Sequence, residues 1–146
     1  YYSDMAVTVP IGKVSSKAKK IIEVSKKALG LGVKKVKPGK TVGDIGNAIQ
    51  KFVESKGFSV VKDLCGHGIG KKLHEDPKIP NFGNKKIGEE LIEGMVICIE
   101  PMITAGLPDL KKSEDGYGFA TKDGSLTSHF EHTIAITQKG ARILTQ

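Results

Sequence analysis

The chain has 146 residues, a net charge of +7, 38% apolar residues and 27% charged residues. These fractions are typical of one globular domain that is large enough to bury a core, and they exclude a disordered chain. No apolar run approaches the roughly 20 residues that a membrane-spanning helix needs, so we expect no membrane span.

The positive charge comes almost entirely from lysine, since Arg142 is the only arginine among 23 basic residues. Base readout in nucleic acids normally uses arginine and interleaved aromatic side chains, which are scarce here. We therefore expect solvated lysine-rich surfaces and no sequence-specific nucleic-acid binding. A salt-sensitive attraction to a polyanionic surface such as the ribosome stays open.

The first four residues (YYSD) contain neither an initiator methionine nor a signal-peptide pattern, which indicates a piece of a longer protein or a trimmed form. Cys65 and Cys98 each sit in an apolar stretch and are too few for a disulfide framework. We interpret both as reduced, small buried residues of a cytoplasmic protein. The alternative, Cys65 as a nucleophile, has no Cys–His–Asn pattern to support it.

The first half of the chain predicts one strand followed by two helices. Residues 2–11 alternate loosely and read as a strand that Pro10 and Gly12 stop. After the capping serines 15–16, apolar residues at three-and-four spacing predict an amphipathic helix with a lysine outer face, ended near residues 37–39. Residues 41–44 resemble a capping box and open a second helix, which Gly57 closes.

The second half predicts mainly strands, at residues 58–61, 95–100, 130–137 and 141–144. Residues 75–93 contain prolines and glycines and are expected to be irregular, and residues 106–127 to form a loop or a loose hairpin. Helices first and antiparallel-looking strands afterwards favour an α+β fold.

His67 lies between glycines in residues 65–70 (CGHGIG). Glycines remove side-chain bulk and permit unusual backbone angles, so another group can approach this imidazole closely. A lone histidine is usually a surface or hydrogen-bonded core residue, but this setting favours a functional one.

Two glutamates lie in apolar strand-like runs. Glu100 follows residues 97–99, and a buried unpaired carboxylate there needs a cation, an arginine or a proton. A metal ion is the simplest partner, and an exposed strand-end glutamate is the alternative. Glu131 repeats the pattern, and strand alternation places His132 on the opposite face, which argues against His132 as a ligand of the same ion. Imidazole and carboxylates from distant segments predict a metal site.

Two further residues are open on this reasoning alone. His74, beside acidic residues 75 and 76 that read as solvated loop acids, suits either metal binding or proton transfer and substrate hydrogen bonding. Asp4, at the start of the chain, reads as a solvated residue.

The chain resembles the bacterial-type (type I) methionine aminopeptidases from about residue 1 to residue 145. The matching segments are residues 57–61, 65–70, 74–77, 94–95, 99–102, 121–125 and 130–133. The resemblance implies the pita-bread α+β fold, with a curved antiparallel sheet backed by helices. It also implies that residues 1–146 are one partial catalytic domain whose N-terminal half is missing.

The resemblance further implies a site. Asp4, His67, Glu100 and Glu131 match ligands of a pair of divalent ions (Co, Mn, Fe or Zn), and one more aspartate of the family would fall before Tyr1. We therefore expect one intact metal site and one incomplete site. His74 matches a catalytic histidine that contacts the substrate, and Leu73 and Tyr117 fall at methionine-pocket positions.

The implied function is removal of the N-terminal methionine from nascent proteins and peptides by a metal-bound water, with Glu100 as proton carrier. Whether this segment is active or inactive on its own stays open. Alternatives are a non-catalytic pita-bread module that binds peptide, RNA or the ribosome, and an aminopeptidase of other N-terminal specificity.

Overall fold

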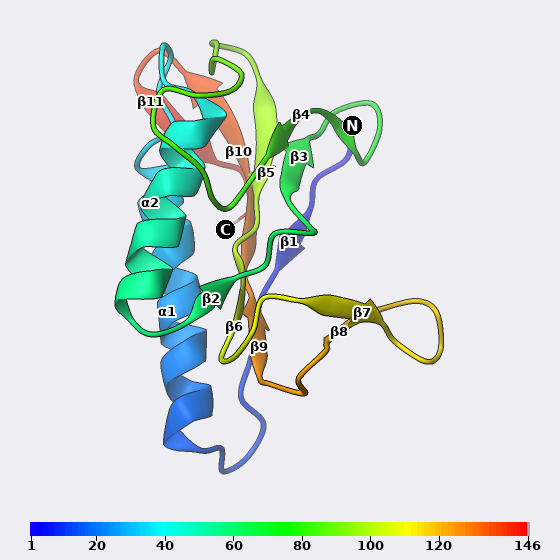
Figure 1. The fold of residues 1–146 in the computed structure, drawn as a ribbon. Helices are drawn as coiled ribbons and strands as arrows, with labels where there is room; N and C mark the ends of the chain where they lie inside the picture. The colour runs from blue at the N-terminus through cyan, green and yellow to red at the C-terminus, as the bar shows by residue number, and fades with distance from the viewer. Residues whose placement is uncertain (146) are drawn as a thin grey trace.

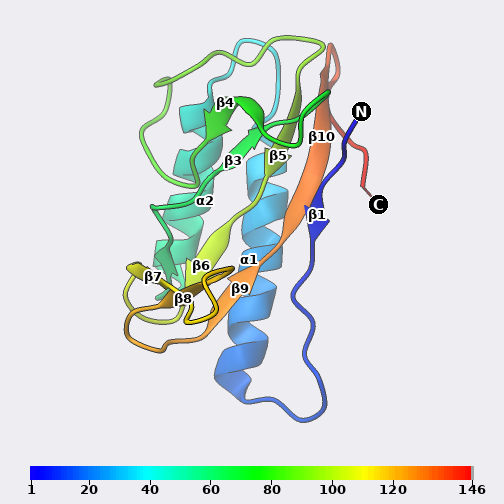
Figure 2. The same cartoon turned by 90° about the vertical axis from the view of Figure 1, so that its right-hand side faces the viewer.

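The computed structural model describes residues 1–145, so residue 146 of the expected domain lies outside the described residues. Two helices lie side by side against one face of a curved, mainly antiparallel set of strands (Figure 1). Turned by 90°, the strands lie in front of the helices (Figure 2). The expected α+β class is confirmed. Neither α1 nor α2, nor any other helix within residues 1–145, is long and apolar enough to cross a membrane.

Both helices begin where the sequence predicts. Helix α1 (Ser16–Val33) starts after Ser15, whose Oγ accepts a hydrogen bond from the backbone N–H of Ala18 at 3.1 Å. Helix α2 (Val42–Ser55) starts after Thr41, whose backbone N–H donates to the Asp44 carboxylate at 3.1 Å. The apolar stripes of both helices are buried in the core, and the lysines of α1 face outward.

The strands form one large sheet and two small ones. The large sheet has the order β1-β10-β5-β3-β4, with β11 paired to β10. Its strands are β1 (Met5–Ala6), β3 (Gly66–Gly68), β4 (Glu75–Ile79), β5 (Val96–Ile99), β10 (Glu131–Thr137) and β11 (Gly140–Ile143). A second sheet contains β2 (Ser59–Val60), β6 (Met102–Thr104) and β9 (Thr127–His129). In the segment expected to be a loop or a loose hairpin, β7 (Leu110–Lys112) pairs with β8 (Phe119–Thr121).

The register of the three central strands sorts their side chains onto two faces. His67 of β3 pairs with Cys98 of β5, which pairs with Thr133 of β10. Successive side chains on a strand alternate between faces, so the neighbouring residues Ile97, Ile99 and Ile134 point the other way. Those three are fully buried in the core cluster shared with the helices. A slip of one residue would exchange the two faces, so the apolar core fixes which face carries the polar residues.

Two expectations about strands are corrected. Residues 75–79 are not irregular: they form β4, which pairs with β3, and Pro77 is tolerated because β4 is an edge strand without a second partner in the sheet. The first strand is reduced to β1. Its continuation is held differently, because the Thr8 hydroxyl donates to the His129 carbonyl at 2.8 Å and accepts from the His129 N–H at 2.9 Å.

The glycines around His67 serve close packing of backbones. A Cβ at Gly66 would overlap the Cys98 carbonyl oxygen, and one at Gly68 would overlap the Asp76 carbonyl oxygen. Neither glycine has a positive φ, so the unusual backbone angles expected there are not the reason for these residues. The backbones of the neighbouring strands β4 and β5 fill the space beside β3.

We expect Gly66→Ala to destabilise the fold by about 3 kcal/mol, since the obstacle is backbone that cannot move aside without breaking the β3–β5 pairing. Urea unfolding of the full-length natural protein measures the change. The matched control is Gly30→Ala on α1, where a Cβ meets nothing within 4 Å and helix propensity predicts a gain of up to about 1 kcal/mol. Equal effects of the two substitutions would contradict the packing argument.

Candidate metal centre

His67 is buried and its ring is oriented by its own strand. Its Nδ1 lies 2.8 Å from the Gly68 carbonyl oxygen. A carbonyl only accepts hydrogen bonds, so Nδ1 carries the proton and Nε2 of the neutral ring keeps a free lone pair. Nε2 points to Glu100 Oε1 at 3.6 Å. This is the orientation of a metal-binding histidine, with its other nitrogen bonded to a backbone carbonyl.

Glu131 is a buried carboxylate that the fold leaves poorly satisfied. It is 4% exposed, and its Oε1 is buried without a hydrogen-bond partner among the described residues. Burial, together with the nearby negative charges of Glu100 and Asp4, raises the pKa of Glu131 to about 7. A cation at this point would remove both the desolvation cost and the repulsion.

Glu100 directly follows β5, and a hydrogen bond to its backbone holds it in place. The side-chain amide of the fully buried Asn81 donates to the Glu100 backbone carbonyl at 3.0 Å. The carboxylate lies between two imidazoles, with His67 Nε2 facing Oε1 and His129 Nε2 at 3.3 Å from Oε2. Glu100 is therefore held at the centre of the polar face.

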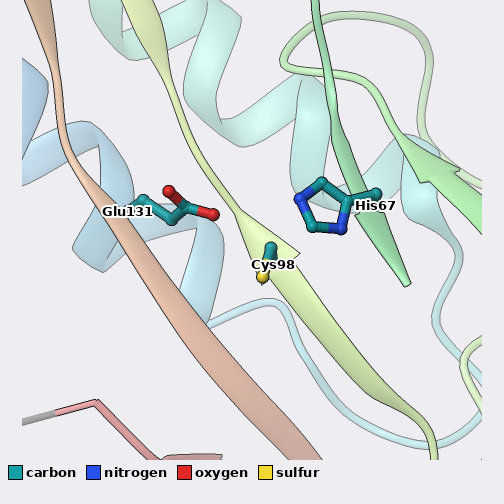
Figure 3. Close-up of side chains that lie close together, drawn as sticks. All are labelled: His67, Cys98 and Glu131. Atoms are coloured by element: carbon teal, nitrogen blue, oxygen red, sulfur yellow. The ribbon is translucent and has the colours of Figure 1, made fainter. Parts of the chain in front are cut away.

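Two compact groups of donor atoms share Glu131. One consists of His67, Cys98 and Glu131, and the other of Glu100, His129 and Glu131; within each group the ligand atoms lie within 4.8 Å of one another. Figure 3 shows the first group, with its three side chains on three neighbouring strands. The structure thus brings together His67, Glu100 and Glu131, which the sequence singled out.

His129 was not predicted from the sequence, and the structure adds it to the cluster. A signal was available: His129 precedes Glu131 by two residues, so extending the strand alternation upstream places both on one face. By contrast, His132 lies off the cluster as expected, with its Nδ1 3.1 Å from the Thr145 hydroxyl.

A cleft of about 730 Å³ adjoins the cluster, and its lining includes His67, His74 and Glu100. The rings of His67 and His74 meet edge to face, with centroids 4.4 Å apart and an interplanar angle of 73°. His74 is solvent-exposed, whereas His67 is buried. An exposed imidazole beside the donor cluster can reach a molecule bound in the cleft.

The other predicted site residues lie farther out. Asp4 exchanges two hydrogen bonds with Thr133, since its N–H donates to the Thr133 hydroxyl at 2.8 Å and its carbonyl accepts from that hydroxyl at 2.7 Å. This holds Asp4 beside Glu131, outside the two compact donor groups. Leu73 is half-exposed, and Tyr117 is 96% exposed on the β7–β8 hairpin; neither lines the cleft. Their roles stay predictions.

Both cysteines are free, and neither environment favours a thiolate. Burial raises the pKa of Cys98 to about 12, and its Sγ lies 3.5 Å from the Thr133 hydroxyl. Burial also raises the pKa of Cys65, which is half-buried in the wall of the cleft. A depressed pKa marks a nucleophilic cysteine, so the nucleophile alternative gains no support.

The donor set fits a divalent cation. It combines a neutral imidazole whose lone pair is free with crowded carboxylates, one of which has an unpartnered buried oxygen. Imidazole with carboxylate suits Zn, Co, Fe and Mn, so the donors alone do not select one metal.

Known proteins resemble this chain in sequence and in fold. Residues 1–138 match the model described as Metallopeptidase family M24. The chain is 46% identical over 146 residues to methionine aminopeptidase 1 of Bacillus subtilis, covering all of this chain and 59% of that protein. Methionine aminopeptidase from Rickettsia prowazekii superposes with a TM-score of 0.96 at 43% identity, covering 99% of this chain and 59% of that one. A prolidase from Pyrococcus horikoshii OT3 superposes with a TM-score of 0.76 at 28% identity, and the match covers 99% of this chain and 36% of that one.

The fold is the expected pita-bread fold. The chain belongs to metallopeptidase family M24, and the resemblance to methionine aminopeptidases is confirmed. The chain spans just under three fifths of the length of the two methionine aminopeptidases compared above.

Metal binding should release a proton at low pH but not at high pH. The pKa of Glu131 in the metal-free protein is about 7, so at pH 6 the carboxyl is mostly protonated and a cation must displace that proton. Below pH 7 the apparent affinity then falls by up to about tenfold per pH unit. Calorimetric titration with Zn²⁺ in two buffers of different ionisation enthalpy counts the protons released.

The control is the wild type at pH 8, where Glu131 is already mostly ionised and releases no proton when the metal binds. Proton release that is the same in the wild type at pH 6 and pH 8 would contradict the assignment to Glu131.

Proposed function

We propose that this chain supplies the metal-binding face of an aminopeptidase that removes the N-terminal methionine from peptides and nascent proteins. The observation that carries the proposal is the convergence of His67, Glu100 and Glu131 beside a cleft that is lined by His67, His74 and Glu100. The 46% identity to a methionine aminopeptidase supports the choice of reaction.

In this proposal His67, Glu100 and Glu131 hold the ion, and Asp4 completes the set from the adjacent N-terminal segment. The bound ion supplies Lewis-acid activation of water and of the scissile carbonyl.

Glu100 accepts the proton of the attacking water and passes it to the leaving amine. Its carboxylate is 13% exposed, so it reaches both the cleft and the donor cluster, and Asn81 fixes its backbone. His74 hydrogen-bonds the substrate backbone beside the scissile amide, because it is exposed to the cleft while its ring packs against His67. Orienting the amide in this way lowers the barrier by fixing the reacting atoms.

The proposal also covers the substrates and the cellular compartment of the reaction. The substrates are peptides and nascent chains that begin with methionine, and the reaction takes place in the cytoplasm. The exposed lysines of α1 provide positive charge for a contact with the ribosome.

Substitutions distinguish the proton-accepting role of Glu100 from the substrate-binding role of His74. Glu100→Gln should abolish turnover of a Met-initiated tripeptide, because the amide accepts no proton and weakens metal binding. His74→Ala should lower kcat by about 100-fold while the metal content of the full-length protein is unchanged. Metal analysis of the purified variants checks the second part, and loss of metal in His74→Ala would overturn the substrate-binding role.

Substrate choice separates this function from that of a proline-directed relative, which the likeness to a prolidase keeps open. The full-length protein should release methionine from Met-Ala-Ser peptides and leave non-methionine peptides with proline second uncut. Liquid chromatography of the products measures both rates. Faster cleavage of the proline-second peptides would contradict the proposed specificity.

A further inference from the structure

His129 is a histidine whose position is fixed from both sides of its backbone. It ends β9, and the Thr8 hydroxyl bonds both its N–H and its carbonyl, at 2.9 and 2.8 Å. Two segments 121 residues apart in sequence therefore hold this residue in place. A side chain carried on so fixed a backbone keeps its direction with little conformational freedom.

The Nε2 atom of His129 faces two carboxylates but makes no hydrogen bond with the described residues. The side chain is 38% exposed overall, yet its Nε2 is buried and has no hydrogen-bond partner among the described residues. The nearest acidic oxygens are Glu100 Oε2 at 3.3 Å and Glu131 Oε2 at 3.9 Å. A buried polar nitrogen that lacks a hydrogen-bond partner is costly, and a cation bound at this atom would remove that cost.

A cation satisfies all three groups at once. The ligand atoms of Glu100, His129 and Glu131 lie within 4.8 Å of one another, so one ion with ligand bonds of about 2.0–2.2 Å can reach them after small side-chain adjustments. The imidazole then gives its lone pair to the ion, and both carboxylates lose their mutual repulsion.

We propose that His129 is a direct metal ligand of this chain, acting with Glu100 and Glu131 through its Nε2 atom. This rests on the proposed metal-dependent function and deepens it by adding a second imidazole to His67 at the centre. Nitrogen donors favour Zn, Co, Ni and Fe over Mg and Mn, so the centre should prefer the former group.

The test replaces the ring and keeps a polar side chain that can still donate a hydrogen bond. In the full-length natural protein, His129→Gln should weaken Co²⁺ binding at least about tenfold. His132→Gln is the matched control, since His132 lies on the next strand and bonds Thr145. That variant should bind Co²⁺ as the wild type does.

Proton NMR of the Co²⁺ form distinguishes a ligand from a neighbour that only orients Glu100. Each bound imidazole with a protonated Nδ1 gives one strongly shifted exchangeable signal. We expect two such signals in the wild type and in His132→Gln, and one in His129→Gln.

A wild type with one signal would overturn the inference even if the variant did not fold. So would a His129→Gln variant that kept both signals, whatever its affinity. A wild type that bound no Co²⁺ at all would overturn the proposed function itself, which separates the two failures.

Discussion

The crowding of carboxylates on one buried sheet face is the constraint on which the site depends. Glu131 lies buried beside Glu100 and Asp4, and one of its oxygens has no hydrogen-bond partner among the described residues. Like charges in a poorly solvated place repel one another and favour protonation. A divalent cation is the partner that removes this cost without a rearrangement of the fold, and it accounts for the free lone pair of His67 as well.

The apolar core makes this crowding tolerable. The residues that alternate with the polar ones, Ile97, Ile99 and Ile134, pack fully buried against the two helices. Burying three such side chains contributes several kcal/mol, roughly 1.5–3 for each. That contribution fixes the strand register, and the register brings His67, Cys98 and Thr133 into one row. The sequence therefore positions the site through residues that never contact a ligand.

Much of this could be read from the sequence because the signals were local. His67 stood out by its flanking glycines, and Glu100 and Glu131 stood out as charges within apolar runs. Both helices carried clear caps and apolar stripes. These features depend on neighbouring residues in the sequence, so one sequence by itself is enough to predict them.

The features that escaped prediction depend on long-range contacts. Residues 75–79 contain Pro77 and look like a loop, and they become a strand only because β3 offers an edge. His129 joins the group of donor atoms with Glu100 and Glu131, and Thr8 fixes its backbone from the other end of the chain. Asp4 looked like a solvated terminal residue until the resemblance singled it out, and its place depends on Thr133, 129 residues away. Local patterns contain none of this information.

The most direct test of the account is an anomalous diffraction map. Crystals of the full-length natural protein grown with Zn²⁺, measured at the zinc absorption edge, should show a peak about 2.0–2.2 Å from His67 Nε2 and from carboxylate oxygens of Glu100 and Glu131. A map with zinc bound elsewhere and no peak among these three residues would contradict the central claim.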